Sequence, residues 1–160
     1  MIFLDTSGLE DGTICLCLTG TAEARPEKQY LPAYYFDICR CDGTRVGTCD
    51  LRIGRNEKIE IGGNIGYTVF PPYRGHHYAA RAVRLLKTLA ARHGMAYLTI
   101  SCVPENAASA RTCELAGGVL TGIVPVPMFS EMYAEGKRFV RVYRFELPVP
   151  EAVQAESCAN

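Results

Sequence analysis

The chain has 160 residues, of which 48% are hydrophobic and 21% are charged. This length allows one domain with a sizeable core, and the composition is that of an ordinary globular protein. Lysine and arginine together number 17, as do aspartate and glutamate, and a net charge of zero argues against a dedicated nucleic-acid-binding protein. No apolar run approaches the roughly 20 residues of a membrane span. Asp5 directly follows Met1–Leu4, so a secretory signal is not expected either.

The cysteines are Cys15, Cys17, Cys39, Cys41, Cys49, Cys102, Cys113 and Cys158. An even count would also suit the disulfides of a secreted protein. Most of these cysteines, however, fall inside strand-like or helical patterns, which favours small packing residues in a reducing compartment. No C-x-x-C pair occurs, so no zinc site is expected. The sequence therefore predicts a cytoplasmic protein without a bound metal.

The first half of the chain carries four strand patterns, over residues 13–19, 33–41, 45–53 and 59–70. Asp42-Gly43 is a typical hairpin turn between the second and the third. The polar segment 21–29 is expected to hold one short helix at most. Gly62-Gly63 interrupts the fourth pattern and predicts a β-bulge. The unpaired N–H groups of such a bulge could donate hydrogen bonds to a thioester carbonyl.

The second half alternates helices and strands. Apolar residues at helical spacing predict a helix over 78–92, which closes at His93-Gly94. Asn106 is a good N-cap for a second helix to about residue 116. The remaining strand patterns cover 96–103, 119–126 and 138–147. This order predicts a mixed α/β fold in one domain over 1–147, followed by a loose tail over 148–160.

The stretch 65–79, IGYTVFPPYRGHHYA, combines a strand, a turn and the start of a helix. Pro71 and Pro72 lack N–H donors, so the strand cannot continue past them. A strand, a short turn and a helix N-terminus direct successive free N–H groups toward one point, where they bind anions, above all phosphates. Arg74 adds a fixed positive charge there.

This stretch resembles the acyl-CoA pyrophosphate loop of the Gcn5-related N-acetyltransferases (GNAT), which reads [RQ]-x-x-G-x-[GA] after a strand of pattern G-Y-x-[VL]. The fitting residues are Arg74, Tyr78 and Ala79 in the loop and Gly66, Tyr67 and Val69 in the strand. His77 stands where the family has its central glycine. We expect His77 to have an ordinary, negative φ and its ring to contact the phosphates. The family's N-x-x-S/A motif is matched by Asn106 and Ser109 on the later helix.

The resemblance implies a mostly antiparallel sheet of about seven strands, flanked by helices and splayed between the fourth and fifth strands, with acyl-CoA in the resulting V. It implies that main-chain groups of Tyr67, Thr68 and Val69 contact the pantetheine arm. The expected pyrophosphate contacts are Arg74, Gly75, His76, His77, Tyr78 and Ala79. The same cofactor is expected to touch Asn106 and Ser109.

Two catalytic residues are predicted less directly. Many family members have a proton-donating tyrosine seven residues after the asparagine, and Cys113 occupies that position here. Relatives often read E-I-G-Y at the central strand, whereas this chain has Asn64, which cannot take a proton. Glu60 is the candidate base because it would share a strand face with Asn64. A base supplied by substrate or solvent is the alternative.

The predicted function is direct transfer of an acetyl group from acetyl-CoA to a primary amine. Acetyl-CoA and the amine are the expected partners, without nucleic acid or membrane, and a homodimer is left open. The alternative is a non-catalytic acyl-CoA-binding protein that keeps the fold, because the glutamate and tyrosine positions are changed. The acceptor itself is not readable. Its pocket residues are predicted among Tyr30, Tyr34, Tyr35, Phe129 and Tyr133, with Glu131 or Glu135 attracting a cation.

Overall fold

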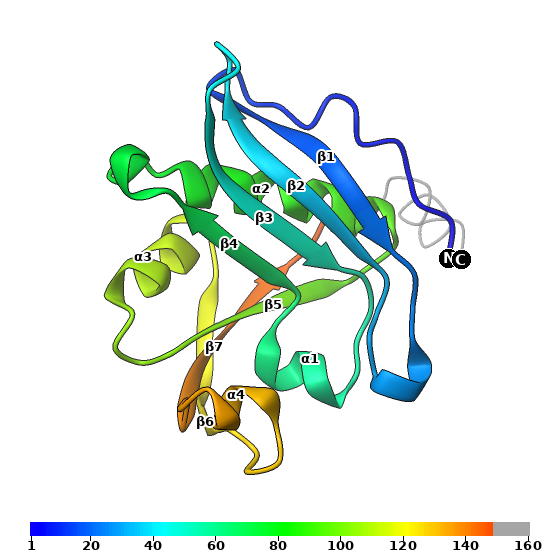
Figure 1. Cartoon of the computed structure of the whole chain (residues 1–160), viewed down its shortest axis with the longest axis vertical. Coiled ribbons are helices and arrows are strands. Elements are labelled where there is room, and N and C mark those ends of the chain that lie inside the picture. Colours follow the sequence, from blue (N-terminus) through cyan, green and yellow to red (C-terminus); the bar gives the residue numbers. More distant parts are fainter. Residues whose placement is uncertain (149–160) are drawn as a thin grey trace, which may run out of the picture.

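The computed structural model describes residues 1–148, so most of the predicted tail lies outside the described residues. The strands are β1 (Ile14–Ala22), β2 (Ala33–Arg40), β3 (Arg45–Arg52), β4 (Ile65–Val69), β5 (Tyr97–Cys102), β6 (Val119–Pro125) and β7 (Phe139–Glu146). The helices are α1 (Glu57–Gly62), α2 (Tyr78–Arg92), α3 (Ala107–Leu115) and α4 (Glu131–Ala134), with short 3₁₀ turns at Pro26–Lys28 and Pro71–Tyr73. Two antiparallel sheets result, in the strand orders β1-β2-β3-β4 and β5-β7-β6 (Figure 1).

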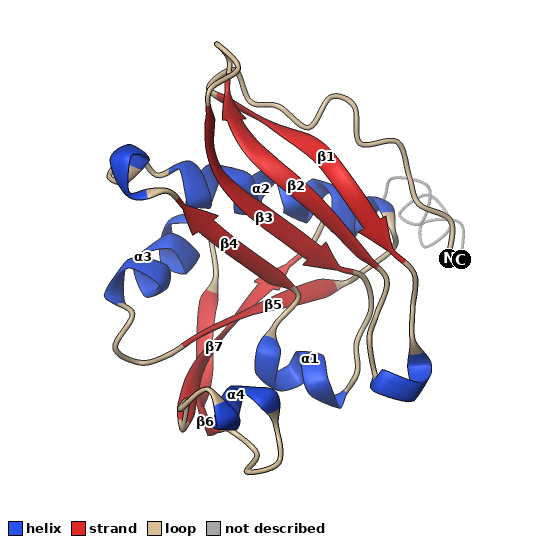
Figure 2. Cartoon of the chain, viewed as in Figure 1, coloured by secondary structure: helices blue, strands red, loops and turns tan. Residues whose placement is uncertain are grey.

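The first sheet buries one face against α2, which runs behind it in Figure 2. On β2, Tyr34, Phe36 and Ile38 are buried in the core, whereas Tyr35 and Asp37 alternate with them on the opposite side. We call that opposite side, away from α2, the outer face. The period of two along the strands and the apolar stripe on α2 together produce this arrangement.

The two sheets are joined where β4 begins. The main-chain N–H of Asn64 donates to the carbonyl oxygen of Thr99 at 2.7 Å, and Gly63 forms an isolated bridge with Ile100. A Cβ atom on Gly63 would lie 2.9 Å from the Ser101 nitrogen, so glycine permits this close approach. Beyond this joint β4 and β5 diverge, which confirms the predicted split of the sheet (Figure 1).

The Asn64 side chain stabilises this contact between β4 and β5 through hydrogen bonds. It is completely buried and its amide nitrogen donates to the carbonyl oxygens of Arg52 and Gly54 at 2.9 and 3.0 Å. Its oxygen accepts from the Thr99 main chain at 3.0 Å and from the Arg55 guanidinium. Since all hydrogen-bonding groups of this amide are used, Asn64 ties the end of β3, the start of β4 and β5 into one unit.

The prediction of a strand over 59–64 is wrong, because residues 59–62 belong to helix α1 and β4 begins only at Ile65. Asn56 caps the helix by accepting from the Ile59 N–H at 2.9 Å, and Gly63 ends it with φ 80°. The local cap and the left-handed glycine outweigh the β-like side-chain pattern. Gly62-Gly63 therefore marks a helix end and not a bulge, and Glu60 does not share a strand with Asn64.

Within residues 1–148, no helix has the length and apolar character needed to cross a membrane. The seven cysteines of this part of the chain are all free. Over the same residues, no group of three or more metal-ligating side chains comes together.

Candidate active site

The predicted phosphate loop joins β4 to α2 on the open side of the V. After the turn Pro71–Tyr73, Gly75 has φ 92° and His77 has φ 59° immediately before the first helical residue. The expectation of an ordinary φ at His77 is therefore wrong. His77 occupies the left-handed region that the family's glycine reaches without strain, because the chain must turn sharply into the helix here.

Replacing His77 with glycine is expected to raise the free energy of unfolding by about 1 kcal/mol, because the strain of a left-handed non-glycine residue is removed. Urea denaturation measures this change. His76→Gly is the matched control: His76 has no positive φ, so it should destabilise by roughly 0.5–1 kcal/mol through backbone entropy. Equal destabilisation by both substitutions would contradict the strain at His77.

The N-terminus of α2 has no side-chain cap. In contrast, α1, α3 and α4 are each capped, by Asn56, Asn106 and Ser130 respectively. The first N–H groups of an α-helix need partners from outside the helix, and its dipole favours an anion at that end. The longest helix of the described chain thus presents uncapped donors at the predicted pyrophosphate position.

Arg74 belongs to the loop that leads into α2. Its Nε donates to the carbonyl oxygen of Val69 at 3.1 Å, which holds the side chain against the end of β4. This bond uses one of the five N–H donors of the guanidinium. The centroids of the His76 and Tyr78 rings lie 5.3 Å apart, so these two side chains of the loop stand next to one another.

Tyr67 connects β4 to α3 across the V. Its hydroxyl lies 2.6 Å from the Ser109 Oγ and 3.9 Å from the Cys113 Sγ. Ser109 and Cys113 therefore lie on the same face of α3, since both reach one hydroxyl. The Asn106 side chain accepts from the Ser109 N–H at 3.0 Å and acts as the cap of α3. Four of the predicted site residues thus form one cluster between the strand and the helix.

Burial limits the chemistry of this cluster. It raises the pKa of Cys113 to about 12 and also raises that of Tyr67. A thiol with the pKa of about 8.5 typical of cysteine holds its proton less tightly. Proton transfer from Cys113 to a departing thiolate of that kind would therefore run uphill, and the role of Cys113 as acid stays a prediction.

Glu60 lies on the exposed side of α1. Its carboxylate pairs with Arg55, with 2.7 Å between Oε1 and Nη2, and the side chain is 53% exposed. The shared strand face that suggested Glu60 as a base does not exist. Its proposed role thus loses the geometric reason on which it was based.

A cavity of about 860 Å³ opens between the β1–β2 connection, α1 and the loop that carries α4. These three segments gather at the lower end of the molecule in Figure 1. Tyr30, Tyr35 and Phe129 line the cavity, as do Glu131 and Glu135, in agreement with the predicted pocket. The other two predicted aromatics do not: Tyr34 is in the main core and Tyr133 packs against the second apolar cluster.

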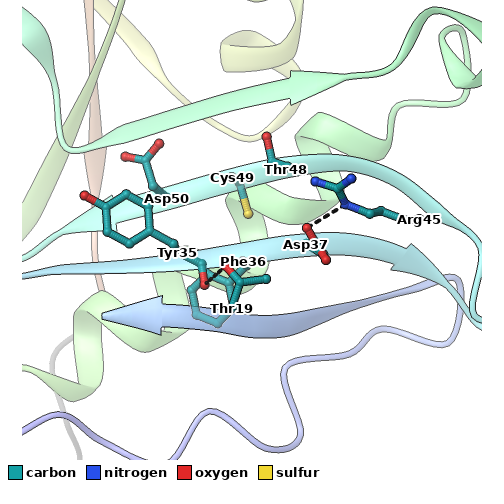
Figure 3. A pocket seen from close by; sticks show the side chains of 8 residues that line it. All are labelled: Thr19, Tyr35, Phe36, Asp37, Arg45, Thr48, Cys49 and Asp50. Atoms are coloured by element: carbon teal, nitrogen blue, oxygen red, sulfur yellow. Dashed lines mark hydrogen bonds and ion pairs between the residues drawn. The ribbon is translucent and has the colours of Figure 1, made fainter. Parts of the chain in front are cut away.

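A smaller hollow of about 360 Å³ lies on the outer face of β1, β2 and β3 (Figure 3). It contains Asp50, which is mostly buried and which the sequence analysis did not single out. The alternating polar residues on β3 indicate that one face of this strand points outward. They do not indicate which side chain lies against β4. Only the register of β3 and β4, which places Asp50 opposite Gly66, provides that information.

Residues 18–119 match the family model described as the acetyltransferase (GNAT) domain. No match was found among curated proteins. Solved structures are similar at low identity. The ribosomal-protein-S5-alanine acetyltransferase from Vibrio fischeri is 20% identical, with a TM-score of 0.56 over 71% of this chain and 61% of that chain. The microcin C7 self-immunity acetyltransferase MccE, in complex with acetyl-CoA and AMP, is 18% identical, with a TM-score of 0.56 over 72% of this chain and 61% of that chain.

A third similar structure is the Salmonella typhimurium enzyme that modifies the N-terminal serine of ribosomal protein L7/L12. It is 21% identical, with a TM-score of 0.56 over 76% of this chain and 67% of that chain. This chain covers less than two thirds of the Vibrio and MccE chains. At these identities the likeness establishes the fold, a mixed α/β fold with a split sheet. The family match extends over more than half of the sequence, and the chain belongs to the GNAT acetyltransferase family.

Proposed function

We propose that this chain transfers an acetyl group from acetyl-CoA to a primary amine by direct attack. The observation that carries the proposal is the uncapped N-terminus of α2, which follows the edge strand of a split sheet and the loop that carries Arg74. An uncapped helix start with a guanidinium next to it suits a pyrophosphate. The V between β4 and β5 suits an extended pantetheine arm.

In this proposal the residues of the loop hold the pyrophosphate and those of β4 and α3 hold the pantetheine arm. The loop residues are Arg74, Gly75, His76, His77, Tyr78 and Ala79. The residues around the arm are Tyr67, Thr68, Val69, Asn106 and Ser109. Holding both substrates in line lowers the entropy cost of their reaction, and this positioning is the contribution that the geometry supports best.

The acceptor enters from the large cavity, on the side of the joint that carries α1. Gly62 and Gly63 line the cavity, so it extends to the point where β4 and β5 meet. Its charged lining residues are Glu23, Glu57, Glu131 and Glu135, with Arg25, Arg52, Lys58 and Lys137. Such a balanced lining suits an amine that carries further polar groups, and the volume is in the range of sites for whole small molecules or a peptide terminus. The free cysteines agree with action in the reducing cytoplasm.

A second candidate is a non-catalytic acyl-CoA-binding protein. The observations in its favour are that Asn64 is fully occupied as a structural amide and that Cys113 is a poor acid. These changes remove two groups that relatives use for proton transfer. Turnover separates the two candidates, because both bind acetyl-CoA and only one consumes it.

Acetyl-CoA at about 100 times its dissociation constant is expected to stabilise the fold by about 2.7 kcal/mol, measured by thermal unfolding. The purified protein should then release free CoA with at least one of a panel of amines: spermidine, lysine, and pentapeptides that begin with alanine or serine. A thermal shift no larger than that caused by AMP would contradict acetyl-CoA binding. Binding without turnover on the whole panel would favour the second candidate.

A further inference from the structure

Asp50 lies on the outer face of β3, directly opposite Gly66 of β4 and next to Tyr35 of β2. A Cβ atom on Gly66 would lie 2.7 Å from the Asp50 Oδ1. The carboxylate therefore occupies the space over the edge strand that only a glycine leaves open. Figure 3 shows the Asp50 side chain extending from β3 toward the neighbouring strand.

This position lies between the two proposed substrate sites. Gly66 is two residues beyond Asn64, where β4 separates from β5 and the V begins. On the other side, Arg52 pairs with Asp50 at 2.6 Å and lines the large cavity. Tyr35 lines both the cavity and the smaller hollow that contains Asp50. An amine that enters from the cavity toward the V would pass this carboxylate.

The surroundings make Asp50 a better proton acceptor than an ordinary aspartate. Burial raises the pKa of Asp50, and the charge of Arg52 and the Gly66 main-chain N–H lower it without cancelling the effect of burial. The other charged groups of the hollow, Asp37 on β2 and Arg45 on β3, form an ion pair with each other at 2.7 Å. A carboxylate with a raised pKa is a stronger base than an ordinary one.

Hydroxyl-bearing neighbours complete the environment of Asp50. They are the Tyr35 phenol on β2 and the Thr48 hydroxyl on β3, together with Thr19 on β1, whose hydroxyl donates to the Tyr35 carbonyl oxygen at 3.1 Å. The neighbouring Cys49 thiol has a raised pKa, first through burial and then through the charges of Asp50 and Asp37. It therefore stays protonated and does not compete with Asp50 for protons.

We propose that Asp50 is the general base that takes the proton of the acceptor amine, an inference that rests on the proposed acetyl transfer. The amine nitrogen forms a bond to the thioester carbonyl carbon while Asp50 accepts its proton. The carbon–sulfur bond then breaks, its electron pair leaves with the CoA sulfur, and the thiolate is protonated by the proton that Asp50 received. The products are the amide and CoA thiol. Asp50 fills the role that Asn64 cannot perform.

Asp50→Asn should lower kcat about 10²–10⁴-fold for the most active amine of the panel, while the KM for acetyl-CoA stays the same. In the wild type, kcat should fall as the pH is lowered through the raised pKa of Asp50, since the base must be ionised. This fall in kcat at low pH, the acidic limb of the pH profile, should be absent from Asp50→Asn. Asp50→Glu, which keeps a carboxylate, should show part of it. Asp37→Asn is the matched control in the same hollow and should keep both kcat and the limb.

Gly66→Ala tests the geometry without changing a charge, because its methyl group would displace the Asp50 carboxylate. Gly66→Ala should lower kcat and shift the acidic limb to a different pH. It replaces Asp50→Asn as the test if thermal unfolding shows that Asp50→Asn is not folded. An active wild type whose kcat and acidic limb survive both substitutions overturns the role of Asp50 alone. A wild type that binds acetyl-CoA but acetylates no amine of the panel overturns the proposed transfer, and the role of Asp50 with it.

Discussion

Asn64→Ala is expected to lower the free energy of unfolding by about 3–5 kcal/mol, because it would leave buried groups of three segments without partners. The main-chain carbonyls of Arg52 and Gly54, the Thr99 N–H and the Arg55 guanidinium all bond to this amide. Each unsatisfied buried polar group costs roughly 1–3 kcal/mol, and part of this cost is recovered when water enters. Urea denaturation with a common m-value measures the difference.

Asn56→Ala is the matched control for this prediction. Asn56 is also an asparagine that bonds to main-chain groups, but it caps α1 on a more exposed part of the surface. Loss of a helix cap typically costs about 1 kcal/mol. A loss at Asn64 no larger than the loss at Asn56 would show that the joint between β4 and β5 does not depend on the buried amide.

Arg74→Ala is expected to weaken acetyl-CoA binding by roughly 1.5–3 kcal/mol, the value of a hydrogen bond to a charged group. This corresponds to about a 10- to 150-fold higher dissociation constant. Isothermal titration with acetyl-CoA measures the change. Binding of S-acetylpantetheine, which lacks the pyrophosphate, should be affected much less, because Arg74 lies at the phosphate end of the proposed site.

Arg92→Ala provides the control for charge. Arg92 is the last residue of α2, at the end of the helix opposite the phosphate loop. The Arg92 Nη1 donates to the carbonyl oxygen of Asp5. Its removal changes the net charge equally and should leave the affinity for acetyl-CoA unchanged. Equal losses for acetyl-CoA and S-acetylpantetheine in Arg74→Ala would place Arg74 outside the phosphate site.

Elements with local signals could be predicted from the amino-acid sequence. The helix α2 begins and ends where the apolar stripe and His93-Gly94 predict, and α3 begins after Asn106. The stretch from β4 to α2, together with Asn106 and Ser109 on α3, indicated the family, because each of these two signals is encoded by neighbouring residues. Caps, prolines and periodic apolar residues act over a few positions, so they are readable without a structure.

Features that depend on contacts between distant residues could not be predicted in this way. Residues 59–62 have a β-like pattern, but Gly63 is held against β5 and they form the end of helix α1. The left-handed φ of His77 follows from the angle between β4 and α2, which a residue type alone does not specify. The carboxylate of Asp50 meets Gly66 only because β3 and β4 pair in one register. A strand pattern tells which face a side chain occupies, but the pairing that selects its cross-strand neighbour is set by the packing of the whole sheet.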